Sequence, residues 1–269
     1  MRKFLVRTSH KPRPLPPGRW ALTQRWNDLL FAHWPVPASA LSKLLPDWLQ
    51  PDTYQGSAWL GVVPFWLDRI RIRGVPPMPG LRNFPDINLR TYVRDQYTGT
   101  PGVYCFSFDA SNLLAVAAAR LLYQLPYYWA DMKFEQRSER EFAFSSSRHL
   151  ARGMVNFSAR YRGLGPTRKT AEYSAGSFEY FFSERSYLFG ANRAGHPVRA
   201  HLHHVPWPLE EAEAEIDRND LATAIGITLP HIEPVLHYSR RLAVYVWPAE
   251  LVRPAMAGHP VTVAAAPSS

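Results

Sequence analysis

The sequence has a single cysteine and no long apolar run. Because Cys105 is the only cysteine among 269 residues, an internal disulfide and a cysteine-rich zinc site are both excluded. No segment approaches the ~20 apolar residues that a membrane-spanning helix needs. The first ten residues also lack an apolar core of signal-peptide length. These absences predict a cytoplasmic protein without a membrane partner.

Lysine is also scarce, although the chain is basic. Five of the 31 basic residues are lysines, and the formal net charge is +9. The many arginines are scattered and form no long basic block. Charge and the 13% aromatic content would suit a nucleic-acid-associated protein, but no nucleic-acid-binding motif is present, so this partner is disfavoured.

Several well-known active-site motifs are missing as well. The chain contains no nucleophile elbow of the Gly-x-Ser-x-Gly type, no Walker loop and no dinucleotide-binding glycine pattern. His201 and His203 would face the same way on a strand and could bind zinc, but no third ligand is evident. Cys105 lies in the alternating run "GVYCFSFD", which is typical of a small core residue. The sequence therefore predicts neither a metal site nor a cofactor.

The 25 prolines and the hydrophobic periodicity predict many short elements, mainly strands. We expect a proline-rich arm at residues 1–19, one β-rich domain at 20–254 and a flexible tail at 255–269. Short helices are expected at 38–45, at 112–124 with Asp109 or Ser111 as its cap, near 178–183 with Ser177 as its cap, and at 220–226. Residues 22–34 and 210–218 fit either a strand or a helix.

The alternating run "DINLRTYVRD" carries the most informative polar face. On a strand, Asn88, Arg90 and Tyr92 share one side, and Ile87 and Leu89 share the other. This face could be the solvated side of a sheet. If it lines a barrel interior instead, the Arg90 guanidinium can bind a carboxylate through two hydrogen bonds, and Asn88 and Tyr92 would orient that carboxylate.

Five runs in this order resemble the YqjF-like family of bacterial proteins, over nearly the whole chain: "NDLLFAHWPVP", "GSAWLGVVPFW", "FPDINLRTYV", "GSFEYFFSER" and "HHVPWPL". That family is similar to the acetoacetate decarboxylase-like superfamily. The resemblance implies a mainly β (α+β) fold, an antiparallel β-barrel-like domain with a few short helices and a conical interior site. A fold does not by itself imply a function, so the chemistry must be argued from the site.

The same resemblance bears on the run from Arg120 to Tyr128. In acetoacetate decarboxylases the corresponding segment ends in Pro-Lys-Lys, and the first lysine forms a Schiff base with the keto acid. Here Pro126 is followed by Tyr127 and Tyr128, and a phenol cannot form an imine. Lys133, on the following strand, is the one remaining lysine that is a candidate to replace them.

We therefore expect an interior pocket with Tyr127 and Tyr128 as catalytic candidates and Asn88, Arg90, Tyr92 and Asp86 as ligand-binding candidates. A small carboxylate or carbonyl compound is the expected ligand, with a tyrosine hydroxyl as donor or acid. The leading hypothesis is a lyase- or hydratase-type enzyme that acts on an oxo acid without a Schiff-base lysine. The alternative is a non-catalytic metabolite sensor or binding protein. The sequence leaves both catalysis and a homo-oligomeric state open.

Overall fold

The computed structural model describes residues 14–76, 78–81, 83–150 and 153–252. Most of the expected arm and all of the expected tail therefore lie outside the described residues. Within them the chain is mainly β, and no helix is long and apolar enough to cross a membrane. The strands are β1 (Leu22–Val36), β2 (Leu49–Pro51), β3 (Ala58–Ile72), β4 (Asn83–Asp95), β5 (Pro101–Ala110), β6 (Tyr127–Trp129), β7 (Asp131–Gln136), β8 (Glu141–Leu150), β9 (Gly153–Gly163), β10 (Arg168–Lys169), β11 (Tyr187–Ala191), β12 (Pro197–His204), β13 (Pro208–Asn219), β14 (Val235–Val246) and β15 (Glu250–Leu251).

The helical elements are short. They are α2 (Ala38–Ser42), η1 (Pro79–Leu81), α3 (Leu113–Ala118), the π-helix η2 (Ala119–Tyr123), η3 (Thr170–Glu172), α4 (Phe178–Ser183) and η4 (Thr223–Ile225). The predicted cap of α4 is confirmed, because the Ser177 side chain accepts a hydrogen bond from the Tyr180 amide. The predicted cap of α3 is wrong: Asn112 caps it, through the amide of Ala115. Both ambiguous segments are strands.

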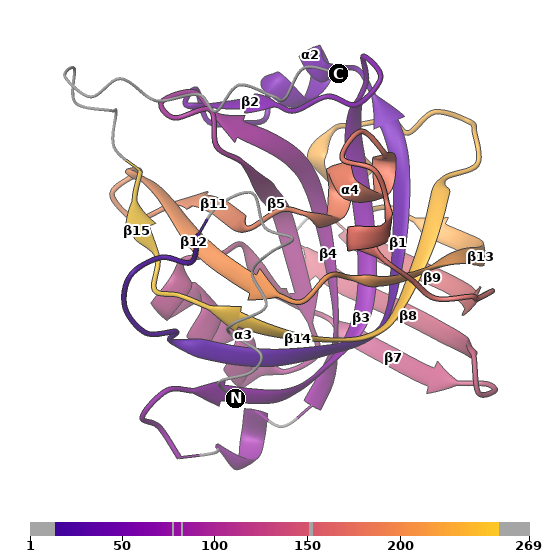
Figure 1. Cartoon of the computed structure of the whole chain (residues 1–269). Helices are drawn as coiled ribbons and strands as arrows, with labels where there is room; N and C mark the ends of the chain where they lie inside the picture. The colour runs from indigo at the N-terminus through magenta and orange to yellow at the C-terminus, as the bar shows by residue number, and fades with distance from the viewer. Residues whose placement is uncertain (1–13, 77, 82, 151–152, 253–269) are drawn as a thin grey trace.

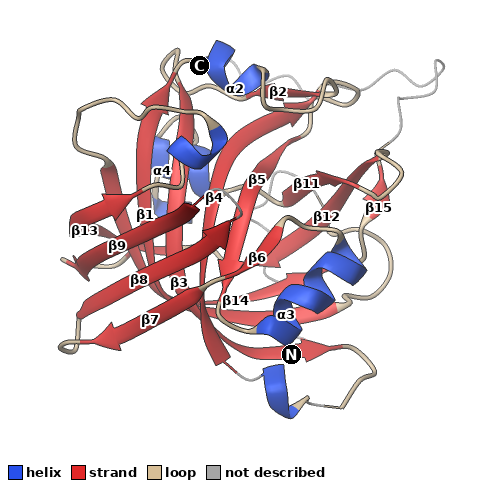
Figure 2. Ribbon diagram, turned by 180° about the vertical axis from the view of Figure 1, so that it is seen from behind, coloured by secondary structure: helices blue, strands red, loops and turns tan. Residues whose placement is uncertain are grey.

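Seven strands form a closed ring, in the order β12-β11-β5-β4-β3-β1-β14, because β12 also pairs with β14. Neighbours in the ring are antiparallel, except for the parallel pair β5–β11. A second group, β13-β9-β8-β7, continues from β14 and lies against the outside of the ring (Figure 1). Seen from behind, α3 lies across the lower end of the ring, near β6 and β14 (Figure 2). The predicted barrel-like fold is confirmed.

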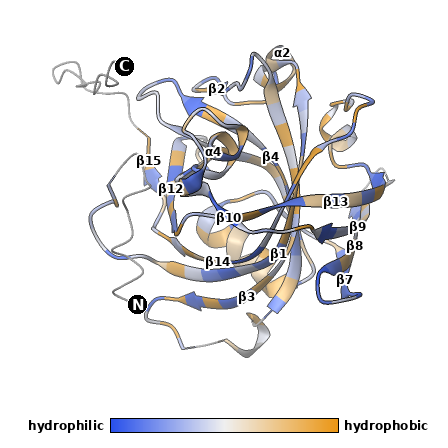
Figure 3. Cartoon of the chain, turned by 45° about the vertical axis from the view of Figure 1, so that its right-hand side comes forward, coloured by the Kyte–Doolittle hydropathy of each residue, from blue (hydrophilic) through white to orange (hydrophobic). Residues whose placement is uncertain are grey.

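The strands β1, β3 and β4 bury both faces. Their inner face contributes Phe31, Phe65 and Tyr92 to a core inside the ring. Their outer face contributes Leu30 and Ile87 to a second core, shared with aromatic residues of β8 and β9. The solvent side of the outer strands is hydrophilic, which the blue segments of β7 and β9 show (Figure 3). A strand buried on both faces reads as a nearly continuous apolar run, as in residues 29–34, and such a run hides the alternation that would mark a strand.

A β-bulge at Asp28 changes which residues of β1 face inward. Asp28 has a positive φ of 52°, and the register with β3 shifts between Asn27 and Ala32. Before the bulge, Trp26 packs in the inner core; after it, Leu29 and Phe31 do. One inserted residue moves the inward pattern from even to odd positions.

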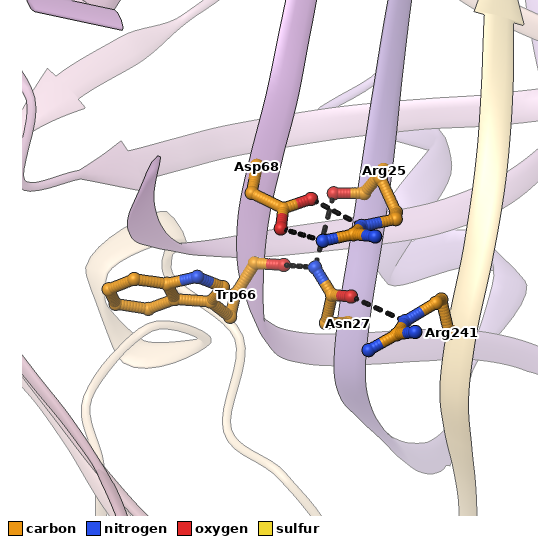
Figure 4. Close-up of polar contacts among 5 residues, drawn as sticks. All are labelled: Arg25, Asn27, Trp66, Asp68 and Arg241. Atoms are coloured by element: carbon orange, nitrogen blue, oxygen red, sulfur yellow. Dashed lines mark hydrogen bonds and ion pairs between the residues drawn. The ribbon is translucent and has the colours of Figure 1, made fainter. Parts of the chain in front are cut away.

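Polar side chains on the outside of β1, β3 and β14 tie this irregular stretch together (Figure 4). Arg25 makes a two-pronged ion pair with Asp68, with Nε 2.6 Å from Oδ1. Asn27 donates to the Trp66 carbonyl (3.2 Å) and accepts from Arg241 Nε (3.1 Å). The amide of Asn27 thus links three strands beside the bulge.

Candidate functional site

The ring encloses a cavity of about 150 Å³. Each of its seven strands contributes lining residues, and most of the lining is aliphatic or aromatic. A few polar side chains reach it from different elements, namely Gln24, Asn88, Arg90, Tyr123, Tyr127, Ser183, Arg185 and His204. A largely apolar pocket with a few polar groups is the usual form of a small-molecule site.

Strand β4 supplies a row of buried polar groups on its inner face. Asn88 and Arg90 line the cavity, and Asp86 lies on the same side of the strand, fully buried. Among the described residues, Asp86 Oδ1, Asn88 Oδ1 and Arg90 Nε have no hydrogen-bond partner. Because buried polar atoms are nearly always paired, such a row next to a cavity indicates a site for a polar ligand or for water.

Tyr127, on β6, connects this row to the neighbouring strand β5. Its hydroxyl donates to Asp86 Oδ2 at 3.1 Å, and its ring stacks on Phe108 with a centroid distance of 4.7 Å. Burial raises the pKa of Asp86 well above its usual range, and the nearby charge of Asp109 adds to the rise. Burial, with the adjacent Asp86, likewise raises the pKa of Tyr127 well above that of a free phenol. Both groups are therefore held in their protonated forms.

Tyr128 does not join Tyr127 in the cavity. Successive residues on a strand point to opposite faces, and Tyr128 pairs in register with Asp109 on the other side of β5. There its ring packs under the Arg148 guanidinium at 4.3 Å, and Arg148 contacts Asp109 at 3.2 Å. Burial raises the pKa of Asp109 to about 6, although Arg148 opposes the shift. The expectation that both tyrosines face the pocket is thus corrected for Tyr128.

Tyr92 is buried between the cavity and strand β1. It does not line the cavity; its hydroxyl lies 2.6 Å from His33 Nε2. Burial, together with Arg90 and His237, lowers the pKa of His33 well below its usual value, so the ring is neutral. Gly61 packs against the His33 ring, and a Cβ at this position would lie 3.0 Å from His33 Cδ2. Tyr92 therefore packs against the polar row of β4 without lining the cavity, and its ring centre lies 5.8 Å from the Arg90 guanidinium.

The sequence interpretation missed Arg185, a second cation in the cavity wall. It follows α4 directly and is held by Asp52, with Nη1 2.6 Å from Oδ2. Its guanidinium also lies 4.3 Å from the centre of the Phe181 ring and 5.4 Å from that of Tyr92. Ser183, on the last turn of α4, lines the cavity too, and its buried hydroxyl has no partner among the described residues. No local sequence pattern indicates that Arg185 lines the cavity, because its partner Asp52 lies 133 residues away in sequence.

The described lysines lie elsewhere. Lys43, Lys133 and Lys169 are all exposed, and none of them lines the cavity. Cys105 does line it, but burial raises its pKa to about 12, so the thiol stays protonated. No group of three or more potential metal ligands occurs in the described part of the chain, and His201 is buried next to Tyr187 and Trp247 instead.

The fold is similar to that of acetoacetate decarboxylase-like enzymes of known structure. The enduracididine biosynthesis enzyme MppR, complexed with pyruvate, matches with a TM-score of 0.58 at 12% identity, over 89% of this chain and 92% of the other. Acetoacetate decarboxylase from Legionella pneumophila matches with a TM-score of 0.57 at 13% identity, over 90% and 91%. An acetoacetate decarboxylase-like enzyme from Sphingomonas wittichii RW1 matches with a TM-score of 0.59 at 13% identity, over 89% and 97%. At these identities the likeness shows the fold alone.

Sequence comparison gives a nearer relative and a family. The chain is 44% identical to the uncharacterized protein YqjF of Bacillus subtilis over 234 residues, which is 87% of this chain and 93% of the relative. A family model described as "uncharacterized conserved protein" matches residues 23–243. That range contains the whole polar row of β4, both tyrosines and Arg185. On this evidence the chain belongs to the DUF2071 family, is related to YqjF and has the acetoacetate decarboxylase-like fold.

Proposed function

We propose that the cavity binds a small oxo acid or related carboxylate and that the protein is a lyase- or hydratase-type enzyme acting on it without a Schiff base. The observation that carries this proposal is the buried row of Asp86, Asn88 and Arg90 beside an enclosed, mainly apolar cavity. A guanidinium in such a place needs an anion to offset its burial. A carboxylate fits its fork geometry.

The head group of the ligand would lie against Arg90. Asn88 is two residues away on the same face and can donate from its amide to a carboxylate or carbonyl oxygen. Arg185 adds a second positive charge to the same cavity, already fixed in place by Asp52. The mainly apolar lining lowers the local dielectric constant, which strengthens each of these polar contacts.

The acid would be Tyr127, backed by Asp86. A protonated Asp86 can donate to the Tyr127 oxygen, which frees the phenol hydrogen for a ligand oxygen in the cavity. As negative charge develops on the ligand carbonyl oxygen, Tyr127 donates its proton there and regains one from Asp86. Both pKa directions support this role, because each group keeps its proton until such an anion forms.

Two further facts support the class of ligand. MppR, which shares the fold, is described in complex with pyruvate and with a condensation product of pyruvate. By the resemblance seen in the sequence, Tyr127 and Tyr128 correspond to the decarboxylase lysine pair, and the described lysines are exposed. An oxo acid would therefore bind here through its carboxylate and carbonyl groups, without covalent capture.

The test is a calorimetric titration with a panel of 2-oxo and 2-hydroxy acids. Arg90→Leu removes the charge and keeps the apolar volume, so the affinity should fall at least about tenfold, the equivalent of losing one charge-assisted hydrogen bond. Arg90→Lys should restore part of the binding, since lysine lacks the bidentate geometry. Arg71→Leu is the matched control, because Arg71 is exposed on β3 outside the cavity. Equal affinity in Arg90→Leu and the parent would contradict the proposal.

Turnover is tested separately. Tyr127→Phe should bind the same acid with similar affinity and lose most of any lyase or hydratase activity, followed by proton NMR of the acid. Binding without turnover in the parent protein would leave the metabolite-sensor alternative in place.

A further inference from the structure

A second, smaller cavity lies against the first, beneath α3. Its volume is about 70 Å³. Leu67, Tyr123 and Tyr127 form part of the wall between the two, because they line both. The residues that line only the smaller cavity are entirely apolar and include Ile70, Ile72, Leu81, Phe84, Ala115 and Ala118. We call this space the annex.

Polarity changes in one direction along β4. Arg90 marks the cationic end, Asn88 and Asp86 follow, and Phe84 lies at the annex. Arg90 and Phe84 lie six positions apart on the same face of this strand, and Tyr127, whose hydroxyl contacts Asp86 between them, lines both cavities. The combined space is therefore polar at one end and apolar at the other, which suits a ligand of the same polarity.

The roof of the annex is weakly held. In α3, Val116 is the buried residue, and the π-helix η2 has no buried residue. Leu122, at the edge of the annex, is 58% exposed. Few buried contacts mean a low cost of local opening, and π-helical turns occur frequently at functional sites.

We infer that the ligand is an amphipathic acid, with its carboxylate at Arg90 and an apolar chain that extends past Tyr127 into the annex. This inference rests on the proposed function and adds the substrate class. An apolar cavity of about 150 Å³ holds a benzene-sized molecule, roughly six heavy atoms. The annex, about half as large, adds about three more on the same scale. A six-carbon 2-oxo acid has a matching size.

The experiment is a calorimetric titration of unbranched 2-oxo acids from three to ten carbons. Each methylene buried in the annex should tighten binding about fourfold, so the six-carbon acid should bind about sixtyfold more tightly than pyruvate. Acids of eight carbons or more should gain nothing further, because they exceed the space. A flat series with measurable pyruvate binding would overturn the inference and leave the proposed function standing.

Ala118→Leu tests the location of the chain. It fills the annex from α3, so the six-carbon acid should lose most of its advantage while pyruvate binds unchanged. Ala117→Leu is the matched control, since Ala117 is exposed on the same helix and lines neither cavity. An undiminished preference for the six-carbon acid in a folded Ala118→Leu protein would overturn the inference. If that variant does not fold, the parent series alone decides it.

The proposed function fails in a different way. If no acid of any length binds, or if binding is insensitive to Arg90→Leu, the head-group assignment is wrong. If hexanol binds as tightly as the six-carbon oxo acid, the annex accepts a chain but the carboxylate is not recognised, which overturns the inference of an amphipathic acid.

Discussion

Removing the hydroxyl of Tyr127 should destabilise the protein by about 1–3 kcal/mol, the usual cost of leaving a buried polar group unpaired. The hydroxyl donates to Asp86 Oδ2 at 3.1 Å, and Asp86 is fully buried. Its other oxygen, Oδ1, already has no partner among the described residues. In Tyr127→Phe both carboxyl oxygens would therefore be buried without a hydrogen bond. The phenyl ring should keep its stacking on Phe108, so packing contributes little to the loss.

Urea unfolding followed by tryptophan fluorescence measures this loss. At an m value of about 3 kcal/mol/M, a change of about 2 kcal/mol lowers the midpoint by about 0.7 M. Tyr128→Phe is the matched control, because phenylalanine keeps the ring contact with Arg148 and the midpoint should barely move. Equal shifts in the two variants, or no shift in Tyr127→Phe, would refute the buried Tyr127–Asp86 pair.

Three further predictions concern the surroundings of the cavity. The raised pKa of Asp109, about 6, means that the folded state binds its proton more tightly than the unfolded state, so stability is lost as the pH rises from about 4 through 6. Asp109→Asn should abolish this loss of about 3 kcal/mol in the free energy of unfolding, measured by urea unfolding between pH 4 and 7. An unchanged pH dependence of stability in Asp109→Asn would contradict the raised pKa of Asp109. Gly61→Val should lower the melting temperature by several degrees, because its side chain would collide with His33; calorimetry showing parental stability would refute the contact. Asp68→Asn should cost about 1 kcal/mol in urea unfolding, since its ion pair with Arg25 is only half-buried, and an effect that persists undiminished in 1 M salt would count against an ionic origin.

The strand pattern of the sequence predicted that Asn88 and Arg90 share a face, but it left open whether that face is solvated or lines the interior. Alternation placed Asn88 and Arg90 on one face of β4, and both line the cavity. The same period-2 rule, applied to Tyr127 and Tyr128, would have separated them. Their resemblance to a catalytic lysine pair suggested a shared site, whereas a strand directs neighbouring side chains to opposite faces.

Other features depend on tertiary structure. The bulge at Asp28 changes the inward pattern of β1, so the strand alternation breaks within residues 22–34 and does not by itself exclude a helix there. Arg185 enters the cavity wall because Asp52, distant in sequence, holds it there. The annex arises where α3 and η2 cross β3 and β4, and no sequence pattern marks it.

Arg90 is proposed to hold an oxo acid in the cavity without formation of an imine. Carbon-13 NMR of a six-carbon 2-oxo acid labelled at C2, in the parent protein and in Arg90→Leu, tests this most directly. We expect a bound-state signal in the ketone region for the parent protein and its loss in Arg90→Leu. An imine signal that borohydride traps on a lysine, or a ketone signal that survives Arg90→Leu unchanged, would contradict it.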